Sequence, residues 1–258
     1  MDIHRPRSWH GAREFLKEIG TIVIGVLLAL SAEQLVESLH WRERVRETRM
    51  QLEDEIAYNA RHGLGWLSTS PCLDQQLAAL NQQLWAARGT GRFAGVPQRF
   101  SPPLTEFKSD AWLNARSLQV SDHLSSKEVR TFSSFYFFPA ELAGDVTTLH
   151  AEAADLEPLT RPLDHVTAAE ADEMLTRVGR ATELQSRMET GMIILVSLAD
   201  RLGAPVPLSE ARQDFAEDRR TYGSCASDPG DVLTALRGGG GEDAIRRRLR
   251  LAQPTLPQ

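Results

Sequence analysis

The chain has 258 residues, of which 41% are hydrophobic, 25% charged and 7% aromatic, an ordinary globular composition that excludes collagen-like, low-complexity and wholly disordered chains. Its 29 basic and 35 acidic side chains give a formal net charge of −6, which disfavours nonspecific nucleic-acid binding as the main role. At roughly 150 residues per domain, the length favours one folded domain with appendages.

The strongest signal lies near the N-terminus, where residues 19–32 carry no charge. In a helix this run spans roughly 21 Å, which is shorter than a bilayer core of about 30 Å. Three interpretations compete: a membrane span, a secretory signal peptide cleaved near Ala29-Leu30-Ser31, and a buried core helix.

Two observations favour a retained span. The apolar pattern continues beyond the cleavage site through Leu39, and Trp9 and Trp41 would lie about 48 Å apart along one helix, close to the full thickness of a bilayer with its headgroups. We therefore predict a transmembrane anchor helix over residues 18–39, in contact with the lipid bilayer, after a short cytoplasmic N-terminus at residues 1–17.

The two cysteines orient the predicted span, because basic residues flank it almost equally on both sides. Cys72 and Cys225 both follow it, and an even count without metal-like spacing favours a disulfide in an oxidising compartment. Two buried thiols in the cytosol are the alternative. We predict a bond between them and a single-pass protein of the bacterial inner membrane, with residues 40–225 forming a periplasmic domain.

A stripe of small residues follows one face of the predicted span. Thr21, Gly25 and Ala29 recur every four residues, a pattern that lets two membrane helices approach closely. The alternative is that glycine and alanine are simply common in membrane spans. The stripe predicts a homodimer that forms through this face.

Helical patterns dominate the rest of the chain, and no segment shows sustained period-two alternation, so we predict an all-α helical bundle with almost no sheet. The anchor helix should continue to about Leu67, with Pro71 stopping or turning the chain before a second helix that ends near Arg88. Later helices are expected at about 108–118, from Ser125 to Phe138, through 142–156, at 167–202 and at 209–222.

Glycine, proline and helix-capping residues predict where these helices begin and end. Residues 89–103 are rich in glycine and proline and predict a long loop, and Pro139 should kink or end a helix. Thr167 with Glu170 forms a capping box at the start of the longest amphipathic pattern. Residues 226–258 predict a loosely ordered C-terminal tail.

An aromatic cluster precedes Pro139. Core packing where helices cross is one interpretation, and an exposed surface for a partner protein or for lipid is the other. The cluster consists of Phe132, Phe135, Tyr136, Phe137 and Phe138.

The chain carries no recognisable catalytic, cofactor-binding or metal-binding motif. Glu37 and His40 have the spacing of half a di-iron carboxylate site, but no second copy occurs. The histidines are scattered without a His-Glu-x-x-His motif, and a Gly-x-Ser-x-Gly motif is absent. We therefore predict no catalytic residue, no cofactor and no metal.

The anchor resembles that of a group of uncharacterised bacterial single-span proteins, over about residues 14–47. The residues that carry the resemblance are Glu18, Ile19, Val23, Ile24, Gly25, Leu28, Ala29, Leu30 and Trp41. The resemblance implies a bacterial inner-membrane protein with an extracytoplasmic helical region, and it implies no particular activity.

These observations favour a binding or scaffolding protein, or an accessory subunit, that works with another envelope protein. An extracytoplasmic ligand sensor that needs a partner for its output is the second hypothesis, and an unrecognised enzyme is the third.

Overall fold

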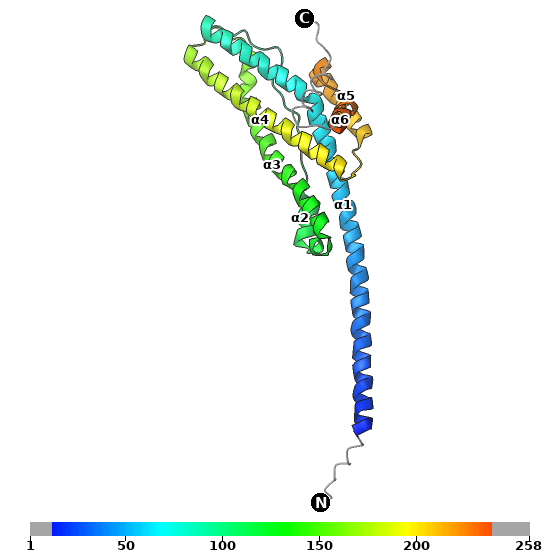
Figure 1. Cartoon of the computed structure of the whole chain (residues 1–258). Helices are drawn as coiled ribbons and strands as arrows, with labels where there is room; N and C mark the ends of the chain where they lie inside the picture. Colours follow the sequence, from blue (N-terminus) through cyan, green and yellow to red (C-terminus); the bar gives the residue numbers. More distant parts are fainter. Residues whose placement is uncertain (1–11, 239–258) are drawn as a thin grey trace, which may run out of the picture. The chain divides into compact units, whose positions relative to one another are not determined.

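The computed structural model describes residues 12–238, and within this range the chain forms helices and their connecting segments (Figure 1). The described helices are α1 Ala12–Thr90, α2 Asp110–Ser117, α3 Ser126–Leu156, α4 Ala168–Arg201, α5 Leu208–Tyr222 and α6 Pro229–Arg237, with 3-10 turns η1 Val120–His123, η2 Glu157–Thr160 and η3 Gly223–Cys225. The described residues pair as sheet only at an isolated bridge between Phe93 and Leu163. The prediction of an all-α protein is confirmed.

The chain divides into two compact units, Met1–Arg49 and Met50–Gln258, and α1 contributes residues to both. In the described part of the first unit, the large apolar side chains from Phe15 to Leu39 are exposed. An 18-residue window of this helix has a mean hydropathy of 2.0, and none of it is buried. Among the described residues, this is the one helix long and apolar enough to cross a membrane. Trp9 lies outside the described residues.

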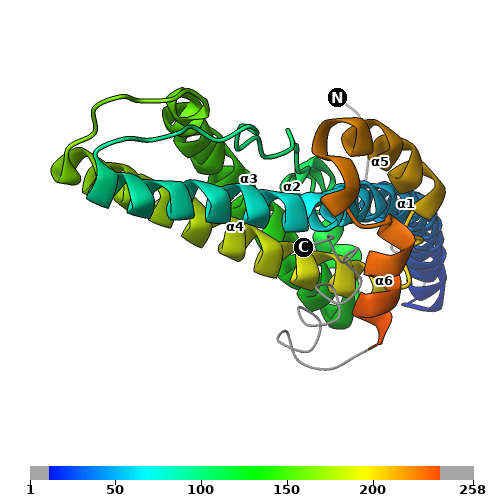
Figure 2. The ribbon, with the colours of Figure 1, turned by 90° about the horizontal axis from the view of Figure 1, so that it is seen from above.

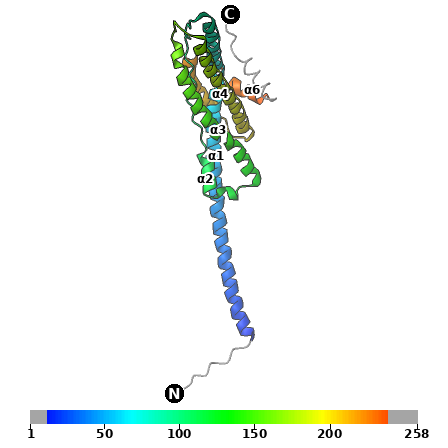
Figure 3. The same ribbon diagram turned by 90° about the vertical axis from the view of Figure 1, so that its left-hand side faces the viewer.

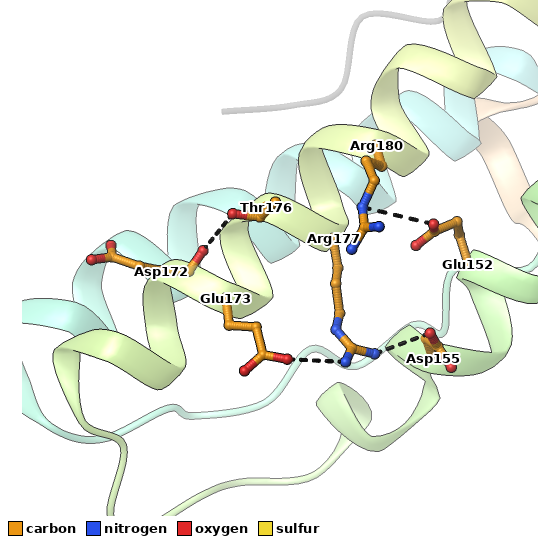
Figure 4. A network of polar contacts seen from close by, with 7 residues as sticks. All are labelled: Glu152, Asp155, Asp172, Glu173, Thr176, Arg177 and Arg180. Carbon is orange, nitrogen blue, oxygen red and sulfur yellow. Dashed lines mark hydrogen bonds and ion pairs between the residues drawn. The ribbon is translucent and has the colours of Figure 1, made fainter.

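The second unit is built on α3, α4 and the part of α1 from Met50 to Thr90, which lie side by side (Figures 1 and 2). α3 and α4 run antiparallel, since Arg177 pairs with Asp155 at 3.0 Å and Arg180 with Glu152 at 3.8 Å (Figure 4). Arg187 and Asp145 continue the same register.

Close packing extends along α4 toward both of its neighbours. At Gly191, an added Cβ would lie 2.5 Å from a methyl carbon of Leu142 on α3. At Gly63 of α1, an added Cβ would lie 2.8 Å from Cγ2 of Val196 on α4. The absence of side chains at these two glycines therefore lets α4 approach both helices closely.

Pro71 does not end α1, so the predicted separate second helix is wrong. The helix continues to Thr90, as Figure 3 also shows from the side, and it changes direction near this stretch (Figure 1). Proline removes one helical N–H and pushes a carbonyl aside, which normally costs about 3 kcal/mol in a helix interior. Residues 66–73 are all buried, so tertiary packing on every side of the helix outweighs this cost.

Polar contacts gather on the buried stretch of α1 around Pro71. The carbonyl oxygen of Ser68 accepts a hydrogen bond from the backbone N–H of Ser227 at 2.8 Å. The hydroxyl groups of Ser68, Thr69 and Ser70 donate to carbonyl oxygens about one turn earlier in the helix. The C-terminal segment thus docks where the proline interrupts the helical ladder.

Pro139 likewise does not end a helix, because α3 runs without interruption from Ser126 to Leu156. Pro139 is buried, and α3 packs along α4 on either side of it. A helix held by a neighbour over its length tolerates the single hydrogen bond that proline removes.

Capping boxes begin the two long helices of the domain. The predicted box at α4 is confirmed: the Thr167 hydroxyl accepts from the backbone N–H of Glu170, whose carboxylate accepts from the Thr167 N–H at 2.8 Å. These hydrogen bonds from Thr167 lower the pKa of Glu170 below its usual value. Ser125 and Glu128 form a second box at α3, which the sequence analysis missed.

The prediction of a loosely ordered tail is wrong for Pro229–Arg237, which forms α6. Asp228 caps this helix by accepting a hydrogen bond from the backbone N–H of Gly230 at 2.7 Å. Val232 and Leu236 are buried, because α6 packs against α4 and α5. Residues 239–258 lie outside the described part of the chain.

Candidate functional site

The second unit contains an open cleft of about 620 Å³ between α1, α5, the middle of the return segment (residues 91–109) and the C-terminal part of α3. Its volume lies within the range of about 300–1,000 Å³ that is typical of ligand pockets. The lining residues are Arg61, His62, Gly65, Trp66, Arg99, Ser101, Pro102, Pro103, Leu104, Thr105, His150, Asp214, Glu217, Thr221 and Tyr222.

The α1 side of the cleft carries polar atoms without partners. Trp66 is only 1% exposed, and its indole Nε1 is buried with no hydrogen-bond partner among the described residues. The same holds for Nε2 of His62. Buried N–H groups are normally paired, so these two atoms mark where a further polar group would be stabilised.

Gly65 lies between these residues and opens the cleft. It is a helix-interior glycine with no heavy atom within 4 Å of the position that a Cβ would occupy. A glycine in a helix costs roughly 0.5–1 kcal/mol relative to alanine, and close packing does not require one here. The space above Gly65 belongs to the cleft.

Charges of both signs line the cleft. From α1, the guanidinium of Arg61 pairs with Glu210 and lies 3.3 Å from Asp214, both on α5. Arg99 reaches Glu157 at 3.6 Å and is exposed. Glu217 makes no ion pair with another described residue. The site therefore offers cationic and anionic groups together.

Burial lowers the pKa of His62, and the neighbouring cation of Arg61 lowers it further. Lys108 acts in the same direction, whereas Asp214 and Glu106 oppose the shift. The imidazole of His62 is therefore neutral at neutral pH. Its ring lies against Tyr58, with the ring centroids 4.3 Å apart.

Side-chain hydrogen bonds fix the return segment that forms one wall. The hydroxyl of Tyr222 donates to the carbonyl oxygen of Ser101 at 2.7 Å, and Nε2 of His150 contacts the carbonyl oxygen of Pro103 at 3.3 Å. Phe100, in the same segment, is buried. Since a carbonyl oxygen only accepts, His150 carries its proton on Nε2 in this contact.

Two residues one turn apart on α1 hold the end of the return segment. Asn59 accepts from the backbone N–H of Lys108 at 2.9 Å and donates to its carbonyl oxygen at 2.8 Å. Glu55 accepts from the backbone N–H of Ala111 at 3.1 Å, in the first turn of α2. Both side chains are buried, so their role is to position the segment.

Among the residues predicted from the sequence, Cys72 and Cys225 lie at disulfide-bonding distance. Their sulfur atoms are 2.05 Å apart and their Cα atoms 5.2 Å apart. The pair joins α1, next to Pro71, to the turn that follows α5. It therefore ties the α5 wall of the cleft to the α1 floor.

The small residues Thr21, Gly25 and Ala29 lie in the first unit and are exposed. No heavy atom lies within 4 Å of a Cβ placed at Gly25, and the Thr21 hydroxyl donates to the Lys17 carbonyl oxygen at 2.9 Å. Their use in self-association remains a prediction.

The aromatic cluster is divided between core and surface. Phe135 and Tyr136 are buried, and the Tyr136 ring stacks on Trp112 with centroids 6.1 Å apart. Phe137 is 60% exposed, while Phe132 and Phe138 are half-buried. A partner surface could use only part of this cluster.

Metal-ligating side chains do not gather in the described part of the chain. Glu37 and His40 are exposed on α1, and no group of three His, Cys, Asp or Glu side chains within residues 12–238 could hold a metal ion.

The cleft could not be predicted from the sequence, because its residues come from four separate segments. His62 lies on α1, Arg99 on the return segment, His150 on α3 and Asp214 on α5. No fixed spacing links them. The available signals were weak: a glycine inside a helix pattern at Gly65, and the adjacent prolines Pro102 and Pro103.

The cleft can bind a polar ligand through fixed donors, acceptors and charges of both signs. Comparisons of the chain with protein-family models, curated proteins and solved structures yield no match.

Proposed function

We propose that this protein is a membrane-anchored binding protein of a bacterial envelope. The N-terminal helix would cross the inner membrane, and the helical domain would lie on the periplasmic side. The observation that carries the proposal is the exposed apolar surface from Phe15 to Leu39. The 18-residue window of highest hydropathy in this helix has no buried residue. Such a surface is costly in water and favourable in a bilayer.

The cysteine pair supports the proposed compartment. Disulfides persist in the periplasm and are rare in the cytosol of most bacteria. Cys72 and Cys225 are separated by 153 positions in the sequence and lie at bonding distance in the fold. An oxidising environment would therefore stabilise the domain as it is observed.

The cleft supports binding as the activity. It joins polar groups of four segments around an open space, whereas the aromatic cluster places two of its rings in the core. Ligand binding with an output through a partner protein is the second candidate function, and it is favoured by the same cleft. The two candidates differ in whether ligand binding alters contact with another envelope protein.

Anchoring is tested by membrane fractionation of the intact protein with an alkaline wash. We expect the full-length chain, with its N-terminal residues present by mass spectrometry, to remain in the membrane pellet. Recovery of soluble protein that lacks these residues would show a cleaved signal peptide and overturn the anchor.

Orientation is tested with two matched cysteine variants, each made in a Cys72→Ser/Cys225→Ser background. Leu104 is 89% exposed in the domain, so Leu104→Cys should react with a membrane-impermeant maleimide in spheroplasts. Ser8→Cys should react only after lysis. The reverse pattern would place the domain in the cytoplasm.

A further inference from the structure

We propose that the cleft binds a short extended peptide. The inference deepens the proposed binding function and rests on it. Four observations carry it: the mixed charges of the lining, the unpartnered polar atoms of α1, the unpaired backbone of the return segment and the open space at Gly65.

The lining charges argue against ligands of a single sign. Asp214 and Glu217 would repel a polyanion such as a nucleotide, and Arg61 and Arg99 would repel a simple cation. A peptide with free ends carries one positive and one negative group. Glu217, which has no ion-pair partner among the described residues, suits the ammonium end, and Arg99 suits the carboxylate end.

The aromatic residues argue against a sugar. Carbohydrate recognition would need an exposed ring face, but Trp66 is 1% exposed and Tyr222 is buried. What Trp66 offers is an indole N–H without an acceptor, and His62 offers a ring nitrogen without a partner. Peptide carbonyl and amide groups supply the complementary acceptor and donor.

The return segment offers the backbone complement of a peptide. The backbone N–H and C=O groups of Leu104 and Thr105, which line the cleft, form no hydrogen bond within residues 12–238. Ser101 and Pro102 each precede a proline, which restricts their backbone to extended or polyproline conformations. The chain therefore reaches Leu104 in an extended conformation. A second extended chain can pair with such free groups, as in peptide recognition by strand addition.

The indole N–H of Trp66 gives a direct test. The full-length protein, labelled with ¹⁵N-tryptophan and held in lipid nanodiscs, is titrated with a pool of synthetic tetrapeptides that have free ends. The Trp66 signal is assigned with Trp66→Phe. We expect a saturable shift of this signal, with little change at the other tryptophans.

Matched glycine variants establish where the peptide binds. Gly65→Leu places a side chain in the open space of the cleft, and we expect the shift to be lost. Gly179→Leu introduces the same side chain at an exposed, unhindered glycine of α4, and we expect the shift to persist. Glu217→Gln should weaken binding of the free-ended pool by several-fold.

A second pool with acetylated and amidated ends distinguishes the source of the peptide. A shift with the free-ended pool alone supports free short peptides, and equal shifts with both pools support a segment within a longer chain. Absence of a Trp66 shift with either pool, an equal shift with inorganic phosphate or glucose, or a shift retained in Gly65→Leu would overturn the proposal. None of these outcomes bears on anchoring, which the fractionation tests separately.

Discussion

Two helix-interior glycines of the second unit lie in opposite surroundings. At Gly191 of α4, an added Cβ would be 2.5 Å from Leu142, so the glycine is needed for α3 and α4 to meet. At Gly65 of α1, nothing lies within 4 Å of an added Cβ. The α3–α4 contact is therefore closely packed, whereas the contact between α1 and α5 leaves an open cleft.

The polar groups of the α3–α4 contact also differ from those of the cleft, because the former are paired and some of the latter are not. Between α3 and α4, three arginines pair with three acidic residues in one continuous register, and two of these pairs are drawn in Figure 4. Around the cleft, the ring nitrogens of His62 and Trp66 have no partner among the described residues. A well-packed contact with paired charges serves stability, and an open one with unpaired groups is available for binding.

Loss of the cysteine pair should have the largest effect, because it ties α5 to α1. In Cys72→Ser/Cys225→Ser we expect the free energy of unfolding to fall by about 2–5 kcal/mol. Hydrogen exchange should rise first in α5 and α6, while α3 and α4 stay protected. Urea denaturation in detergent micelles, compared with the oxidised parent, measures the loss. An unchanged denaturation midpoint would show that the pair carries no stability.

Gly191→Ala should destabilise the α3–α4 contact by about 1–2 kcal/mol, since the new methyl group overlaps the buried Leu142 side chain. Gly179→Ala is the matched control on the same helix, and its open surroundings predict a gain of about 0.5–1 kcal/mol. The same denaturation measurement compares them. Equal effects at the two positions would contradict the close packing.

Gly65→Ala should stabilise the protein by about 0.5–1 kcal/mol, because alanine is the better helix former and its methyl group enters open space. Gly63→Ala, two residues earlier on α1, should instead destabilise the protein, because Cγ2 of Val196 lies 2.8 Å from the added Cβ. Opposite signs in the measured free energies of unfolding would confirm that the two faces of α1 differ as the structure indicates.

Local chemistry explains which elements were predictable. The capping box of Thr167 and Glu170 involves only four consecutive residues, so it can be recognised in the sequence. The helix α4 begins at Ala168, directly after this N-cap. The cysteine pair was predictable from count and position. The helix ends predicted at Pro71 and Pro139 and the loose order predicted at α6 were wrong, because burial against distant segments outweighs the local signals. The cleft joins residues from four segments, so no local pattern could reveal it.

The cleft should make stability sensitive to acid through His62. Its pKa is lowered in the folded protein, so below the unfolded value of 6.5 the unfolded chain binds a proton more readily than the folded one. Stability is therefore retained above pH 6.5 and falls as the pH decreases from there toward the lowered folded pKa. His62→Gln should show a smaller loss between pH 7 and pH 5 in urea denaturation. An identical pH profile would exclude His62 as the cause.

The smallest effect should come from the paired charges between α3 and α4. Arg177 lies 3.0 Å from Asp155 and 3.0 Å from Glu173, but all three side chains are at least a third exposed, so water screens the attraction. A double-mutant cycle with Arg177→Gln and Asp155→Asn should give a coupling energy of about 0.2–1 kcal/mol. Raising the salt concentration should reduce it. A coupling larger than the Gly191→Ala effect would mean that ion pairs, rather than close packing, hold the two helices together.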